Sequence, residues 1–210
     1  MLYRNDGIFT VGLTGMSGAG KTTACEVFAR SGFDIVDCDE VARAVVEPGK
    51  PALEAISAFF GSDILRGDGK LDRGKLGGIV FSDAGKLKAL NDIIYPFITF
   101  EIISRIISFP AGKKRPVLLD APTLFESGAD ALCDTIVCVT ADREFCAQRI
   151  MARDGLTREQ AEKRLGSQHD ADFYRERSRF CAENKGTREE FTIALSGIAG
   201  EILSLAGQES

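Results

Sequence analysis

The segment GMSGAGKT, residues 15–22, is the feature that most constrains what this chain can fold into. It matches the pattern G-x-x-x-x-G-K-[ST], follows an apolar β-branched run at residues 8–14, and opens a run that favours a helix. Glycines in such a loop allow backbone N–H groups to turn inward around phosphate oxygens, and the following helix adds a favourable dipole. A chance glycine-rich turn is the alternative, but motif and context together favour a nucleotide site.

The side chains of this loop predict particular contacts. Lys21 is expected to reach the β- and γ-phosphates, and the Thr22 hydroxyl is expected to bind Mg²⁺. The nucleotide-binding residues expected in the loop are Gly15, Ser17, Gly18, Ala19, Gly20, Lys21, Thr22 and Thr23. The loop by itself does not name a reaction, because switches, motors and kinases all use it.

Sequence features outside the loop narrow the class. A GTPase would carry N-K-x-D for guanine, but Thr187 stands in the place of the acid in NKGT, residues 184–187. A motor would normally be longer than 210 residues, and a net charge of -5 does not suggest nucleic-acid binding.

The six cysteines form no C-x-x-C pair, which is typical of a reduced cytoplasmic protein. Neither a secretory signal nor an apolar stretch long enough to span a bilayer is expected. Among the proteins that use such a loop, a small-molecule kinase is therefore the favoured class.

The order of apolar runs predicts an α/β fold. Strands are expected at residues 8–14, 33–37, 116–122, 134–140 and 179–183, with helices between them. This alternation predicts a parallel sheet with helices on both faces. The helical block at residues 48–109 is too long for one crossover, so an inserted subdomain is expected, with Pro96 ending one helix near Tyr95 and separating it from the next.

The stretch DCDEVAR, residues 37–43, has two interpretations. Asp37 and Glu40 can begin a helix as an N-cap and a capping-box-like partner. Asp39 and Arg43 are four residues apart and share a helix face, where a surface ion pair is one possibility. The other is a site, because both follow the second strand and ligands of such sheets bind beyond the carboxyl ends of the strands. Asp39 would then accept a proton from an acceptor hydroxyl, and Arg43 would bind an anionic part of the acceptor.

Several blocks of this chain resemble the dephospho-CoA kinase family. They are LTGMSGAGKTT, DCDEVARAVVEPGKPAL, DGKLDRGKLGGIVF, LNDIIYPFI and APTLFESG, and the resemblance extends from about residue 11 to residue 205. It implies a P-loop kinase fold: a five-stranded parallel sheet flanked by helices, with an inserted helical substrate-binding subdomain and a helical lid. It implies one domain over residues 1–210, with a core at about 8–47, 115–148 and 181–206, a CoA-binding insertion at about 48–114 and a lid at about 149–180.

The resemblance also implies a reaction and its residues. The activity would be ATP-dependent phosphorylation of the ribose 3′-hydroxyl of dephospho-CoA, the last step of coenzyme A synthesis, in a monomer or weak homo-oligomer. Asp39 would be the general base and Arg43 would lie near the acceptor. Arg149 would clamp the transferring phosphate, with Arg153 a weaker candidate, although Arg149 could instead serve as an i,i+4 partner. Asn184 and Gly186 fall where the family has a turn beside adenine.

Departures from the family pattern concern individual positions. Tyr95 replaces a common histidine before Pro96, and Thr123 replaces a leucine in P-L-L-F-E. Met16 fills a variable loop position and is expected to affect packing only. Asp120 could hold Mg²⁺, although not every family member needs an acid there, and His169 is expected on the lid surface. Another small-molecule or nucleotide kinase is the alternative within this class, and a nucleotide-dependent switch is the alternative outside it.

Overall fold

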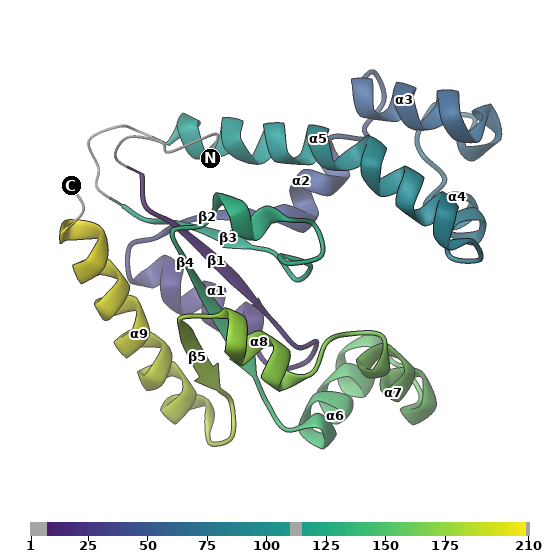
Figure 1. Cartoon of the computed structure of the whole chain (residues 1–210). Helices are drawn as coiled ribbons and strands as arrows, with labels where there is room; N and C mark the ends of the chain where they lie inside the picture. The colour runs from purple at the N-terminus through teal and green to yellow at the C-terminus, as the bar shows by residue number, and fades with distance from the viewer. Residues whose placement is uncertain (1–7, 110–114, 209–210) are drawn as a thin grey trace. The chain divides into compact units, whose positions relative to one another are not determined.

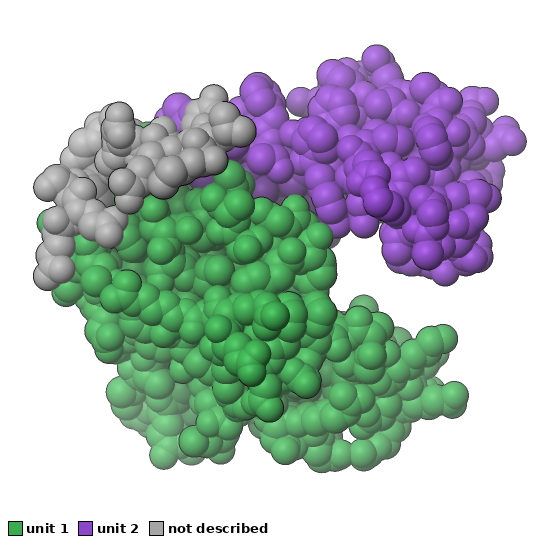
Figure 2. Space-filling model, viewed as in Figure 1, with its two compact units in different colours: residues 1–36, 109–210 green, residues 37–108 purple. Residues whose placement is uncertain are grey.

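The computed structural model describes residues 8–109 and 115–208 (Figure 1). The N-terminal residues 1–7 and the last residues of the expected insertion, 110–114, lie outside these ranges. The chain divides into two compact units (Figure 2). We call Met1–Val36 with Phe109–Ser210 the sheet unit, and Asp37–Ser108 the helical unit.

Five strands form the sheet in the order β2-β3-β1-β4-β5. Their bounds are Thr10–Gly15 for β1, Asp34–Asp37 for β2, Val117–Asp120 for β3, Thr135–Thr140 for β4 and Phe180–Glu183 for β5. Strand β1 lies at the centre, parallel to β3 and β4, and β4 is parallel to β5. All six residues of β1 are buried, which explains why its sequence TVGLTG contains no charged residue and no alternation of apolar and polar side chains. The predicted five-stranded parallel sheet is therefore confirmed.

Helices cover the sheet on both sides (Figure 1). Helix α1, Lys21–Arg30, packs on β1 and β3, whereas α8, Ala171–Arg177, packs on β4 and β1. Helix α6, Arg143–Asp154, packs against α7, Arg158–Gly166. The closing helix α9, Arg188–Gln208, contacts α1 and β5.

Helix α9 is relevant to the expectation that no apolar stretch is long enough to span a membrane. Within the described residues, Arg188–Gly207 is long and apolar enough to do so by length and composition. One face of this helix is buried in the core of the sheet unit, through Phe191, Leu195, Ala199 and Ile202. Their spacing is that of a helix face packed on a protein core, so we interpret α9 as a core helix.

The helical unit is built around one long helix. Helix α5, Ala84–Ser108, contacts α2, Cys38–Ala44, α3, Pro51–Phe60, and α4, Arg73–Val80. A short 3₁₀ turn, η1, Ser62–Ile64, follows α3. In the sheet unit a second one, η2, Ala129–Leu132, precedes β4.

The prediction that Pro96 separates two helices is wrong, because α5 continues through it. Proline removes one helical hydrogen bond and crowds the preceding turn, at a cost of about 3 kcal/mol. Here Pro96 and Asp92, four residues earlier, are both exposed, so the carbonyl that loses its N–H donor can bind water instead. Packing of α5 on three other helices offsets the remaining cost, and the helix bends along its length (Figure 1).

The expected boundary of the insertion differs from the boundary between the compact units. We expected the core to extend to residue 47, whereas the helical unit already begins at Asp37. Helix α2 contacts α5, which explains why the segment after β2 clusters with the helical unit. The assignments of a CoA-binding insertion and a lid concern ligands, and they remain predictions.

Candidate active site

The loop between β1 and α1 has the backbone geometry expected of a phosphate-binding loop. Gly15, Gly18 and Gly20 have φ values of 130°, 80° and 120°, which L side chains rarely adopt. A Cβ at Gly15 would lie 2.0 Å from the Val139 carbonyl oxygen, so this glycine is also required by close packing on β4. Met16 is buried in the core, in agreement with a packing role.

Lys21 curls back over this loop. Its Nζ donates to the carbonyl oxygens of Gly15 at 2.7 Å and Met16 at 3.1 Å. Burial lowers the pKa of Lys21, the negative charge of Asp120 opposes that shift, and Arg153 adds to it. The ammonium is therefore held at the loop by interactions that a phosphate group could replace.

Asp120 ends β3, next to the end of β1. The register pairs it with Leu13, two residues before the loop. Its Oδ2 accepts a hydrogen bond from the Cys25 thiol of α1 at 3.1 Å. This contact fixes the carboxylate on the side of the loop where Lys21 lies.

A pocket of about 460 Å³ opens at the start of α1. It is lined by Thr22, Thr23, Phe145, Arg149, Asn184, Gly186, Arg188 and Phe191. Of the predicted site residues, this pocket brings together the two threonines, Arg149, Asn184 and Gly186. A pocket with two aromatic rings, two arginines and a buried amide suits a base and its attached phosphates.

Asn184 is the buried polar group of this pocket. Its side-chain Nδ2 donates to the Ala19 carbonyl oxygen at 2.7 Å, which ties the turn after β5 to the phosphate-binding loop. The side chain of Asn184 thus positions the loop, a role that the family resemblance did not suggest.

The two candidate arginines of α6, Arg149 and Arg153, behave differently. The Arg149 guanidinium lies 5.3 Å from the centre of the Phe145 ring, and a Cβ at Gly20 would lie 3.4 Å from its Nη1. Arg153 instead pairs with Asp154, at 2.7 Å between Nε and Oδ1. Arg149 therefore lies against Gly20 and is not held by an acidic partner among the described residues, whereas Arg153, whose charge also acts on Lys21, is engaged by Asp154.

The segment between α7 and α8 contacts the same loop. The backbone N–H of Ser17 donates to Gln168 Oε1 at 2.9 Å. Neighbouring His169 stacks on Phe173 at 3.6 Å and lies 3.7 Å from Glu126 Oε1. Sequence reasoning missed Gln168, because a single exposed glutamine carries no motif.

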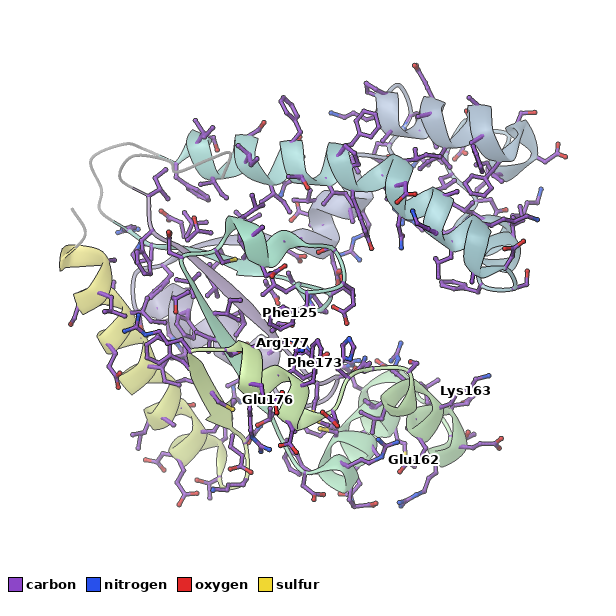
Figure 3. All side chains as sticks on the ribbon, viewed as in Figure 1. Phe125, Glu162, Lys163, Phe173, Glu176 and Arg177 are labelled. Atoms are coloured by element: carbon purple, nitrogen blue, oxygen red, sulfur yellow. The ribbon has the colours of Figure 1, made fainter. Side chains whose placement is uncertain are left out.

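An aromatic cluster stands beside this segment. Phe173 meets Phe125 edge-on at 5.6 Å between ring centres, and the Arg177 guanidinium lies 4.0 Å from the centre of the Phe173 ring (Figure 3). Glu162 on α7 pairs with Arg143 of α6 at 3.0 Å. These contacts join α8 to Phe125 and α7 to α6, on either side of this segment.

The acidic stretch lies mainly on α2, in the helical unit. Asp37 caps the helix, with its Oδ1 accepting from the Glu40 N–H at 2.9 Å. The capping-box-like role of the Glu40 side chain is wrong, because that carboxylate pairs with Arg105 of α5 at 3.1 Å. Asp39 and Arg43 are exposed on α2 and lie in a different compact unit from Lys21.

The residues at the loop fit a magnesium ion that is bound together with nucleotide phosphates. In the described ranges no three His, Cys, Asp or Glu residues form a metal-binding group. Mg²⁺ in phosphoryl-transfer enzymes uses one or two protein oxygens, phosphate oxygens and water. The Thr22 hydroxyl at the pocket and the Asp120 carboxylate beside Lys21 are oxygens of that kind.

Residues 9–190 match the sequence profile of a family described as dephospho-CoA kinase. The chain belongs to the dephospho-CoA kinase family. This P-loop kinase is 34% identical to a dephospho-CoA kinase of Lactobacillus johnsonii, with 92% of this chain and 98% of that protein covered. It is 40% identical to one from Listeria innocua, with 86% of this chain and 90% of that protein covered.

Solved structures agree with this family and fold. The kinase is similar to TT1252 from Thermus thermophilus, with a TM-score of 0.79, 30% identity and coverage of 92% and 97% of the two chains. It is also similar to a dephospho-CoA kinase from Campylobacter jejuni, with a TM-score of 0.70, 27% identity and coverage of 93% and 97%.

The departures of this kinase from its family pattern have simple structural settings. Thr123 is exposed, so its polar side chain occupies no core position, whereas the neighbouring Leu124 is fully buried. Tyr95 is half-buried within α5.

Proposed function

We propose that this kinase transfers the γ-phosphoryl group of ATP to the ribose 3′-hydroxyl of dephospho-CoA, giving CoA and ADP in the last step of coenzyme A synthesis. Membership of the family carries the proposal, and a phosphate-binding loop that holds Lys21 beside an acidic strand end supports it. The reaction needs a donor site, a charge clamp and a base, and the chain offers residues for each.

The donor site is assigned to the loop and the pocket beside it. Backbone N–H groups of Ser17, Gly18 and Gly20 would face the phosphates, and Lys21 would exchange its carbonyl partners for β- and γ-phosphate oxygens. The adenine would occupy the pocket near Gly186. Thr22, with Asp120 as a second oxygen, would hold Mg²⁺, which neutralises developing charge on the phosphates.

Arg149 is the proposed clamp on the transferring group. Its guanidinium lines the pocket and stands close to Gly20, at the start of α1. A planar cation at this point can stabilise charge on the equatorial oxygens in the transition state.

The acceptor residues are assigned from topology. Strand β2 ends at Asp37, and Asp39 follows two residues later, as the loop follows β1. Carboxyl ends of parallel strands share one edge of a sheet, where ligands of such folds bind. We assign Asp39 as the base for the 3′-hydroxyl and Arg43 as an anion-binding group. Residues 48–114 would bind the CoA portion, and 149–180 would close over ATP.

The proposed setting is the cytoplasm, with the protein as a monomer or weak homo-oligomer and without a nucleic-acid or membrane partner. Six cysteines without a disulfide among the described residues fit a reducing compartment.

The test is a product assay with a panel of acceptors. Purified protein and Mg·ATP are mixed separately with dephospho-CoA, nucleoside monophosphates and small alcohols. Formation of ADP and CoA with dephospho-CoA alone is the expected result. Preferential turnover of another acceptor would assign a different kinase activity, and ATP hydrolysis without a phosphorylated acceptor would indicate a switch.

A further inference from the structure

Cys138 and Cys181 face each other across two neighbouring strands. The parallel register of β4 and β5 pairs their Cα atoms directly. Neighbouring strands lie about 4.8 Å apart, and residues paired in this way point to the same side of the sheet. Cα atoms about 4.4–6.8 Å apart can be bridged by a disulfide. Their Cα atoms therefore lie within the range that a disulfide spans, and bond formation requires the two sulfurs to be drawn together.

The surroundings of the two thiols are unequal. Cys138 is fully buried, whereas Cys181 is exposed on the edge strand β5. The Cys181 Sγ lies 3.5 Å from the Thr140 hydroxyl oxygen, and the positive charge of Arg175 on α8 acts on it. The Cys181 sulfur is thus accessible to solvent and lies near a positive charge, whereas the Cys138 sulfur is buried next to it.

The acid–base properties of the pair follow from this arrangement. Its contact with Cys138, aided by Thr140 and Arg175, lowers the pKa of Cys181 to about 6. The same contact and burial raise the pKa of Cys138. A low-pKa exposed thiol beside a protonated one is the arrangement of an attacking and a resolving cysteine.

We propose that Cys138 and Cys181 form a thiol–disulfide site that reacts with low-molecular-weight disulfides and is coupled to the nucleotide pocket. The Cys181 thiolate attacks one sulfur of R–S–S–R, which forms a mixed disulfide and releases RS⁻. The Cys138 sulfur then attacks the Cys181 sulfur, and its proton passes to the departing second RS⁻, which leaves as RSH. The two protein thiols are oxidised by two electrons and the reagent disulfide is reduced to two thiols.

The coupling to the nucleotide pocket runs along β5. This strand ends at Glu183, which pairs with Arg175 at 3.4 Å, and Asn184 follows directly. Asn184 holds the Ala19 carbonyl and lines the pocket. Drawing Cys181 toward Cys138 shifts this strand end, so the disulfide form is expected to bind ATP more weakly.

The first test exposes the reduced full-length protein to glutathione disulfide, followed by intact mass and peptide mapping. A glutathione adduct on Cys181 should form first and convert to a Cys138–Cys181 cross-link that dithiothreitol reverses. Cys138→Ala should stop at the adduct, Cys181→Ser should give neither product, and the control Cys133→Ser should behave as wild type. Equal modification of Cys181 and the partly exposed Cys25, Cys38 and Cys133, or an adduct that never resolves, would overturn the proposal.

Two further measurements are independent of any turnover. The rate of alkylation of Cys181 by iodoacetamide should rise with a midpoint well below pH 8.5, the ordinary pKa of a cysteine, and a midpoint at or above pH 8.5 would overturn its activation. Calorimetry should show ATP binding weakened at least about fivefold in the cross-linked protein and restored on reduction. An unchanged Kd in protein whose cross-link is confirmed would overturn the link to the pocket.

Discussion

The side-chain amide of Asn184 donates a hydrogen bond to the backbone carbonyl of Ala19, at 2.7 Å and across 165 positions of the sequence. Asn184 is 6% exposed and Ala19 is fully buried, so the bond is largely shielded from water. This bond joins the turn after the last strand to the loop after the first, and both line or adjoin the same pocket.

Asn184→Ala should destabilise the fold and weaken ATP binding together. The Ala19 carbonyl would stay buried without its donor, at a cost of about 1–3 kcal/mol. Thermal unfolding and calorimetric titration with ATP measure both effects. The control is Lys185→Ala, at an exposed neighbour that pairs with Glu183. Equal effects in the two variants would show that the Asn184 bond has no special role.

Asp39→Asn should reduce kcat by about 10²–10⁴-fold if general-base catalysis is lost, with ATP affinity nearly intact. Single-turnover kinetics with dephospho-CoA and ATP titrations separate the two quantities. Glu40→Gln is the matched control, because it removes a neighbouring carboxylate whose exposed ion pair with Arg105 contributes at most about 1 kcal/mol. A near-normal kcat in Asp39→Asn would reduce Asp39 to a surface residue of α2.

Gln168→Ala should tighten ATP binding about two- to tenfold. The Gln168 carbonyl oxygen occupies the Ser17 N–H, which is a candidate donor to phosphate, and such a bond contributes about 0.5–1.5 kcal/mol. Lys163→Ala, an exposed position on α7, is the control for surface changes in this segment (Figure 3). Weaker binding in Gln168→Ala alone would mean that Gln168 assists the nucleotide instead of competing with it.

The raised pKa of Tyr174 predicts that the free energy of unfolding decreases at alkaline pH. Burial, with a smaller contribution from the charge of Glu126, raises the pKa of Tyr174 from 10.0 to about 12. Between these values the unfolded chain binds fewer protons than the folded one, so the free energy of unfolding falls as pH rises, by up to about 1.4 kcal/mol per pH unit. Urea unfolding at pH 9 to 12 should show this slope reduced in Tyr174→Phe. Parallel profiles for the two proteins would contradict it.

Strand positions could be predicted because buried parallel strands are short runs of apolar and β-branched residues without charges, and β1 and β4 both follow that rule. The loop could be predicted because its glycines meet a backbone requirement that other residues cannot meet. The continuation of α5 through Pro96 could not be predicted, because the helix is stabilised by packing on other helices, which local sequence patterns do not show.

Several residues that line the pocket could not be predicted from the sequence either. Phe145 and Phe191 are spaced like ordinary core residues, and Arg188 resembles a charge on a solvated helix start. The pairing of Cys138 with Cys181 depends on strand register, which the sequence does not specify when two parallel strands are joined through several helices.

The most direct test of the central claim follows the phosphoryl group itself. Dephospho-CoA is incubated with the kinase, magnesium and ATP labelled in its γ-phosphate, and the labelled product is located by ³¹P NMR and mass spectrometry. We predict label only on the ribose 3′-oxygen of CoA, at a rate abolished in Lys21→Ala. Label on another acceptor atom, or in inorganic phosphate alone, would contradict the account.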